Sequence, residues 1–253
     1  MKSIILLALF SNCLYNSFSQ SYTSTGLQAN LSDLVKSQSG RAMPGQRLQT
    51  FGGETIGSRF YYPEFTEGMV ISTTKDTLSK AYLFVFDKIG QQIYVINKSE
   101  RYSDNPVITQ LYNDQVLKFM LKAKDESPRW FVNARAYDHT NLHDFFEVLE
   151  QRDSGITVLE KIETEFIPTN VNNVGDYFRG QTHDEYKDKL TIFVSIKHGQ
   201  PVPVEIKRKT IADAFPAQFK SYIESYWSSH DQEEFDARFV ARMATALNNQ
   251  YYP

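Results

Sequence analysis

The sequence predicts a mainly β protein of the α+β class. The expected core is a curved antiparallel meander of about ten strands, with a half-barrel as one form it can take, and helices packed on it. Three observations support this prediction. Apolar residues alternate over residues 57–207, turn residues rather than helices separate the apolar runs, and a helical period takes over in residues 208–253. Residues 1–19 are expected to form a leader, and residues 20–56 a polar N-terminal segment with one short helix.

The segment Ala81–Asn97 (AYLFVFDKIGQQIYVIN) is expected to be the central hairpin of the sheet. Its apolar runs, Tyr82–Phe86 and Ile93–Ile96, consist of aromatic and β-branched residues, which favour strands. Neither run has a polar face, so both faces of the pair are predicted to be covered. Between the runs, Asp87 suits the start of a turn, and Gly90 can take the positive φ of a short hairpin turn.

Short apolar stretches separated by brief polar turns predict the other strands as antiparallel neighbours. With those of the hairpin, the predicted strands are Gly68–Thr74, Lys80–Asp87, Gln91–Asn97, Val107–Tyr112, Gln115–Ala123, Arg129–Ala136, Asp144–Glu150, Ile156–Ile167, Lys189–Lys197 and Val202–Lys207. The longer polar stretch Asn170–Tyr186 is predicted to be a loop. No helices alternate with the strands, which argues against a parallel α/β sheet.

Beyond residue 207 the apolar residues follow a helical period. Thr210 with Asp213 resembles a capping box that opens a short helix, and Pro216 suits the start of a second helix. Asp231 with Glu234 is expected to open a third. The apolar stripes of the second and third helices contain Phe219, Tyr222, Ile223 and Tyr226, and Phe235, Phe239, Met243 and Leu247. These stripes are expected to cover an open face of the sheet.

The N-terminus has the pattern of a secretory signal peptide. Lys2 precedes the apolar run Ile4–Phe10, and small residues precede a cleavage site before Gln20. The protein is therefore expected to be exported to the periplasm or cell surface and to be soluble after cleavage. The only cysteine, Cys13, lies in this leader. Lipidation of Cys13 is the disfavoured alternative, because Phe10-Ser11-Asn12 before it fits a lipoprotein signal poorly.

Residues 20–56 are polar and are not expected to form a domain of their own. Within them, four apolar residues follow the i, i+4, i+7, i+8 spacing of a helix face: Leu27, Leu31, Leu34 and Val35. This spacing predicts one short amphipathic helix.

The composition narrows the range of partners. The chain has 253 residues, of which 41% are hydrophobic, and this is enough for one sizeable core. The net charge is −3, so the chain lacks the excess of Lys and Arg that is typical of a nucleic-acid-binding protein. After the leader, no apolar run approaches the roughly 20 residues that a membrane-spanning helix needs. Neither nucleic acid nor the interior of a bilayer is a predicted partner.

Four segments and the helical tail form a pattern larger than any single strand. The segments are Gly57–Gly68 (GSRFYYPEFTEG), Ala81–Asn97, Phe145–Leu149 (FFEVL) and Thr157–Lys161 (TVLEK). Together they resemble a family of uncharacterised exported β-rich envelope proteins frequent in the Bacteroidota, although Phe84-Val85-Phe86 stands where relatives usually carry Arg-Tyr-Asn-like residues. The resemblance covers residues 57–249. It implies an envelope location and a curved antiparallel sheet with terminal helices, and it implies no activity.

Patterns of catalysis and metal binding are weak. His139 and His143 have the spacing of a zinc-binding helix, but Thr140 stands where the HExxH pattern requires glutamate. We interpret both histidines as loop residues and predict no metal. The sequence has no G-x-S-x-G elbow and no glycine-rich phosphate loop, so no cofactor is predicted either.

A glycosidase-like acid pair needs two carboxyl groups whose environments separate their pKa values. One sequence cannot identify such a pair among the many carboxylates of the later strands, which are Glu147, Glu150, Glu160, Glu163 and Glu165. Glu163 and Glu165 alternate along a predicted strand and are expected to face solvent.

These observations favour a non-enzymatic envelope protein that acts as a binding or interaction module for another envelope protein. The alternative is a periplasmic carrier that holds an apolar small molecule in the cup of a half-barrel. Five aromatic residues are the candidates to line such a cavity: Tyr82, Phe84, Phe86, Phe119 and Phe131. A hydrolase comes third, because no catalytic motif supports it.

Overall fold

The computed structural model describes residues 21–23, 55–102, 106–138, 141, 143–168, 184–197 and 199–252. The leader with Cys13, the helix predicted around Leu27–Val35, and His139 lie outside these residues. Most of the predicted loop Asn170–Tyr186 does so as well. The expectations about export, lipidation and the N-terminal helix therefore stay predictions.

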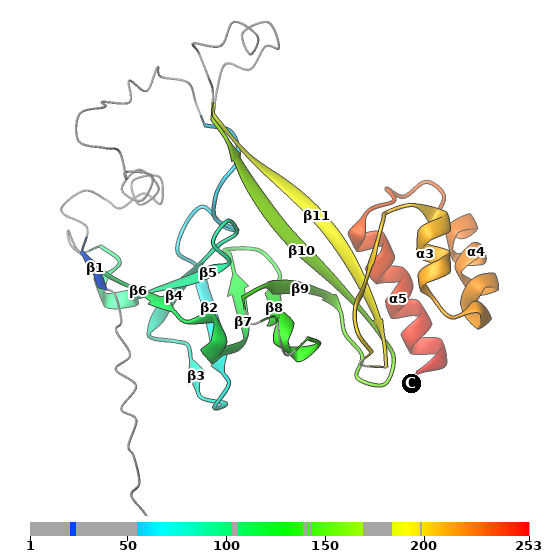
Figure 1. Ribbon diagram of the computed structural model, residues 1–253, viewed down its shortest axis with the longest axis horizontal. Helices are drawn as coiled ribbons and strands as arrows, with labels where there is room; N and C mark the ends of the chain where they lie inside the picture. Colours follow the sequence, from blue (N-terminus) through cyan, green and yellow to red (C-terminus); the bar gives the residue numbers. More distant parts are fainter. Residues whose placement is uncertain are drawn as a thin grey trace, which may run out of the picture.

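Antiparallel strands dominate the described part of the chain and form two sheets, as Figure 1 shows. The small sheet consists of β1 (Ser21–Thr23), β4 (Tyr82–Asp87), β5 (Gln92–Asn97) and β6 (Val107–Leu111), in the order β1-β6-β5-β4. The large sheet consists of β2 (Glu67–Ser72), β3 (Thr77–Leu78), β7 (Val116–Lys122), β8 (Arg129–Asn133), β9 (Phe145–Glu150), β10 (Ile156–Ile167), β11 (Glu185–Ile196) and β12 (Val202–Val204). Its order is β12-β11-β10-β9-β8-β7-β2-β3, so the strands from β7 to β12 form the predicted meander. The predicted fold class is confirmed, but the predicted central hairpin lies in the small sheet with β6 and β1 rather than in the meander.

Both faces of the β4–β5 hairpin are covered, as its two apolar faces predict. On one face, Phe84 and Phe86 pack against the inner face of the large sheet. On the other face, Leu83 and Val85 pack with Phe60, which comes from the segment leading into β2. All five side chains are buried. The hairpin is thus the middle layer of this half of the molecule.

The turn of this hairpin partly contradicts the prediction. Asp87 opens it as expected, because its Oδ1 accepts hydrogen bonds from the backbone N–H of Ile89 (3.0 Å) and of Gly90 (3.3 Å). The positive φ that we assigned to Gly90 belongs instead to Gln91, at 49°. A Cβ atom at Gly90 would lie 3.0 Å from Asp87 Oδ2, a tight contact that favours glycine at this position.

The side chain of Gln91 makes one hydrogen bond within the turn and two with residues far away in the sequence. Its Nε2 donates hydrogen bonds to the carbonyl oxygens of Lys88 (2.9 Å) and Ile162 (3.1 Å). Its Oε1 accepts one from the N–H of Phe145, at 3.0 Å. The side chain thereby ties the turn of the small sheet to β9 and β10 of the large sheet.

The strand predictions are mostly accurate to one or two residues, and Ile156–Ile167 is confirmed at both ends. The largest error is β11, which begins at Glu185, inside the predicted loop. Strands β10 and β11 pair along their full length, from Ile156 opposite Ile196 to Ile167 opposite Glu185. The outer part of this ribbon is polar and exposed, so it lacks the apolar alternation by which strands are recognised.

Three helices follow the sheet: α3 (Arg208–Ala214), α4 (Lys220–Ser229) and α5 (Ala237–Tyr251). Figure 1 shows them together at one end of the molecule, beside β10 and β11. Phe239, Met243 and Leu247 of α5 lie in one buried cluster with residues of β10 and β11, which confirms that the apolar stripe covers the sheet. Within the described ranges, no helix has both the length and the hydropathy to cross a membrane.

Two of the predicted helix starts are wrong. Lys207 is the N-cap of α3, and Thr210 lies inside the helix. The N-cap of α5 is Asp236 rather than Asp231, and its Oδ1 accepts a hydrogen bond from the Phe239 N–H at 2.7 Å. Ser, Thr, Asn and Asp favour turns as well as N-caps, so a capping pattern alone does not locate a helix start. Pro216 precedes a short 3₁₀ turn that leads into α4, close to its predicted role.

Candidate functional site

Four of the five predicted lining residues form solid core. Phe84, Phe86, Phe119 and Phe131 are each at most 1% exposed. The rings of Phe119 and Phe131 stack with centroids 4.6 Å apart, and Phe86 lies 5.1 Å from Phe119. These rings fill the space between the two sheets with one another. Their geometry is that of close packing rather than of a cavity wall.

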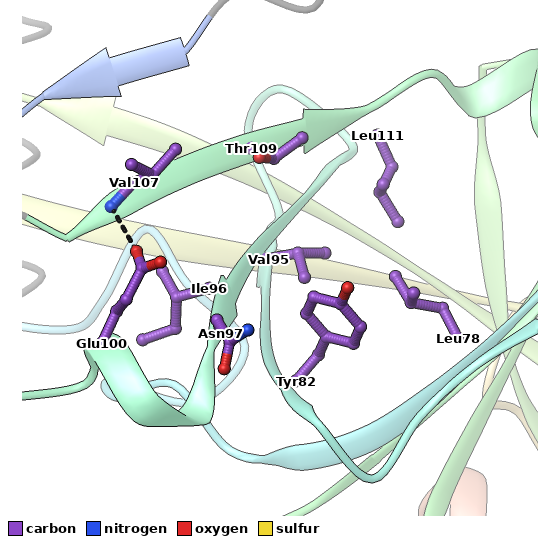
Figure 2. A pocket seen from close by; sticks show the side chains of 9 residues that line it. All are labelled: Leu78, Tyr82, Val95, Ile96, Asn97, Glu100, Val107, Thr109 and Leu111. Atoms are coloured by element: carbon purple, nitrogen blue, oxygen red, sulfur yellow. Dashed lines mark hydrogen bonds between the residues drawn. The ribbon is translucent and has the colours of Figure 1, made fainter.

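Tyr82, the fifth predicted residue, lines a separate hollow of about 320 Å³. The hollow lies beside the small sheet, where β3 at the edge of the large sheet approaches it. Its walls come from β3 to β6 and the turn after β5, and they consist of Leu78, Tyr82, Val95, Ile96, Asn97, Glu100, Val107, Thr109 and Leu111. Figure 2 shows Leu78, Tyr82, Val95 and Leu111 around a common space.

The hollow has an apolar floor and a polar rim. Glu100 stands at the rim, where its Oε2 accepts a hydrogen bond from the Val107 N–H at 2.9 Å (Figure 2). Asn97 Oδ1 accepts hydrogen bonds from the N–H (3.0 Å) and hydroxyl (2.9 Å) of Ser99, which fixes the turn beside it. Such a surface suits an apolar group of modest size whose polar part stays near the rim.

Strand β6 forms one wall of the hollow and carries an extended segment along its other side. There β1 pairs with it antiparallel, with Ser21 opposite Thr109 and Thr23 opposite Val107. The N–H of Val107 is directed to Glu100, on the β5 side. Since backbone groups alternate along a strand, the peptide groups of Ile108 and Gln110 face the outer edge. The site therefore combines an apolar hollow with a strand edge that accepts another strand.

A group of polar and charged side chains lies where the cover of the large sheet changes from the small sheet to the helices. Glu147 of β9 is buried, and its carboxylate accepts hydrogen bonds from Tyr61 (2.8 Å), Arg238 (2.6 Å) and Arg129 (3.5 Å). Glu160 of β10 stands directly opposite Glu147 and is also buried. We call these five residues the seam cluster.

The two glutamates of the seam cluster occupy different environments. Burial, and then the negative charge of Glu147, raise the pKa of Glu160 to about 7. Glu147 instead faces two arginines. Burial and Glu147 also raise the pKa of the Tyr61 hydroxyl, which stays protonated as a donor. Because its own partners enclose Glu147, the cluster acts as an ionic bridge between β8, β9 and α5.

A register shift between β9 and β10 places two glutamates on the face of the large sheet that the helices cover. The pairing slips at Val158/Leu159, so Glu150 and Glu147, three residues apart, both face the helices. Glu150 accepts hydrogen bonds from Thr245 (2.7 Å) and Asn248 (2.9 Å) of α5. Polar bonds thus supplement the apolar stripe of α5.

The structure brings no metal site together among the residues it describes. His143 is exposed two residues before β9. Glu163 and Glu165 are exposed, as their alternation predicts. Of the residues that line the hollow, the sequence pointed only to Tyr82. The only sign of the seam cluster was a glutamate within the apolar run FFEVL.

No known protein family, curated protein sequence or solved structure matches this chain. The resemblance to exported Bacteroidota proteins therefore stays a prediction. The hollow beside β6 is interpreted from its own geometry.

Proposed function

We propose that this protein is an exported, non-enzymatic module of the cell envelope that binds another protein through the hollow beside β6. The observation behind this proposal is the combination of an apolar hollow and a strand edge that already carries an extended segment. Backbone pairing along an edge supplies affinity for a strand, and pockets beside the edge select its side chains.

The N-terminal sequence supports the proposed location. Lys2, the apolar run Ile4–Phe10 and the small residues before Gln20 are typical of a chain that leaves the cytosol. The resemblance of Gly57–Gly68 and the central hairpin to exported envelope proteins points the same way.

Site-specific photocrosslinking in native envelopes tests the proposal. A photoreactive amino acid replaces Val107, at the hollow, or Lys118, an exposed residue of β7 on the opposite face of the large sheet. We expect one defined protein adduct from position 107 and none from position 118. Equal labelling at both positions, together with turnover of a substrate by the purified monomer, would contradict the proposal.

The apolar floor of the hollow keeps one alternative open, in which the protein carries an apolar small molecule. A volume of about 320 Å³ lies at the lower end of the range for ligand pockets. Native mass spectrometry of the purified protein distinguishes the two functions. A carrier retains an extra mass that disappears when Thr109→Trp fills the hollow, whereas a strand-binding module has the mass of the bare chain.

A further inference from the structure

We infer that the partner of the β6 edge is β1 of a second copy of this chain, so that two molecules exchange their N-terminal strands. The inference rests on the proposed function, since it names the strand that the β6 edge takes. Three features of the molecule support it: the nature of the edge, the identity of the strand seated on it, and the length of the chain that connects them.

The edge of β6 lacks the devices that usually keep strand edges from pairing. Its sequence, VITQL, has no charge and no proline over five residues. The two edges of the large sheet are shorter: β12 has three residues including Pro203, and β3 has two. The other edge of the small sheet, β4, is already bridged by Phe60 and Thr66. β6 is therefore the edge of the described sheets that most needs a cover.

The strand that covers this edge is the chain's own β1. Its three described residues, Ser21, Tyr22 and Thr23, pair with Thr109, Ile108 and Val107. A net contribution of about 0.5–1.5 kcal/mol per hydrogen bond makes so short a strand easy to release. The same strand from another molecule fits with the same register, because the two sequences are identical.

The connection after β1 allows this exchange. Residues 24–54 link β1 to the rest of the described chain, a stretch of 31 residues. A chain of that length reaches up to roughly 100 Å, whereas a compact protein of 253 residues has a radius of gyration of about 18 Å. The strand can thus reach β6 of its own molecule or of a neighbour. Reciprocal exchange gives a closed two-fold dimer.

Concentration decides between the two arrangements, because both make the same strand contacts. A tethered strand competes at an effective concentration of about 1 mM for a short flexible linker, and at less for a longer one. Exchange should accordingly become measurable as the protein concentration rises from about 10 µM towards 1 mM. Confinement in the envelope favours it further.

Disulfide trapping tests the exchange in the full chain carrying Cys13→Ser. Thr23 and Val107 stand opposite each other, and a disulfide requires a Cα separation of about 4.4–6.8 Å, which paired strands satisfy. One preparation carries Thr23→Cys and a second carries Val107→Cys. They are mixed, equilibrated and briefly oxidised at several concentrations. The register control replaces Val107→Cys with Leu111→Cys, and a third preparation carries both Thr23→Cys and Val107→Cys in one chain.

We expect a disulfide-linked heterodimer of the Thr23→Cys and Val107→Cys chains that increases at least tenfold between 10 µM and 1 mM. The mixture with the Leu111→Cys chain should give at most a tenth of this yield of heterodimer.

The inference of strand exchange is wrong if the double variant closes its disulfide within one chain and the mixture yields no heterodimer at 1 mM. The proposed function survives that result, because its test is the protein captured at position 107. If neither the mixture nor the double variant forms the disulfide, β1 does not occupy the edge of β6, and the inference is also wrong.

Discussion

One face of the large sheet is covered in two different ways. Towards β7 and β8, the small sheet closes over it through rings such as Phe86, Phe119 and Phe131, which are almost fully buried. Towards β10 and β11, the helices close over it with residues such as Met243 and Leu247. Between these two cores lies the seam cluster, in which charges replace apolar contacts.

The difference between the apolar cores and the charged seam cluster indicates which contacts depend on pH. Apolar packing depends little on pH, and stacked rings tolerate little change of volume. The seam holds Glu147 and Glu160 opposite each other and balances them with Arg129 and Arg238. We therefore expect the ring core to set the overall stability, and the seam to set how the attachment of the helices varies with pH.

The ring core should give the largest effect. Phe131→Ala leaves a cavity under the stacked ring of Phe119 and should lower the free energy of unfolding by about 3–5 kcal/mol. Urea denaturation measures it. Phe166→Ala is the matched control, because that ring is 42% exposed, and a loss there of the same size would contradict the comparison.

Removal of an arginine from the seam should come next. Arg238→Met leaves the buried carboxylate of Glu147 with the more distant Arg129 and Tyr61, and should cost about 2–3 kcal/mol of stability. Arg242→Met on the same helix breaks an exposed pair with Glu233 and should cost less than about 0.5 kcal/mol. Equal losses in the two variants would show that the seam is no more than a surface ion pair.

Glu160 should make stability depend on pH. Its pKa is raised from 4.5 to about 7 on folding, so the folded state holds a proton that the unfolded state has released. Below about pH 4.5 Glu160 is protonated in both states and does not lower the free energy of unfolding. As the pH rises to about 7, the unfolded state loses this proton first, and the free energy of unfolding decreases. Glu160→Gln should therefore be about 2–3 kcal/mol more stable than the native chain at pH 8 and gain almost nothing at pH 4.5.

Thermal unfolding of the native and variant chains at several pH values measures this difference. Glu163→Gln, on an exposed position of the same strand, is the control and should follow the native chain at every pH. A constant offset of Glu160→Gln across the whole range would show that burial, rather than titration, produces its effect.

The N-cap of α5 should give the smallest effect. Asp236→Ala removes the hydrogen bond to the Phe239 N–H and should cost about 1 kcal/mol. Relief of the repulsion between Asp236 and Glu160 offsets part of this loss at high pH. Asp213→Ala, exposed on α3, should change stability by less than about 0.5 kcal/mol, as measured by urea denaturation.

Much of the fold could be predicted because it depends on local patterns. The two apolar faces of Tyr82–Asp87 and Gln92–Asn97 predict a hairpin covered on both sides, and the structure confirms it. The spacing of Phe239, Met243 and Leu247 predicts the buried face of α5. Errors arose where local patterns were ambiguous, as at Gly90, and where they were absent, as in the polar start of β11.

The candidate site could be predicted only in part. Among the five aromatic residues expected to line a cavity, the structure places Tyr82 at the hollow and the four phenylalanines in the core. An aromatic residue on an apolar strand face looks the same in the sequence whether another layer covers it or not. The outcome depends on where the large sheet ends relative to the small one.

The sequence by itself determined the strands, the covered hairpin and the apolar face of the last helix, because side-chain period and turn chemistry are properties of neighbouring residues. Only the tertiary structure decided that Glu147 meets Glu160, that Gln91 joins the two sheets, and that β6 forms an open wall beside a hollow. These features depend on register and on contacts between residues far apart in the chain. No local pattern encodes them.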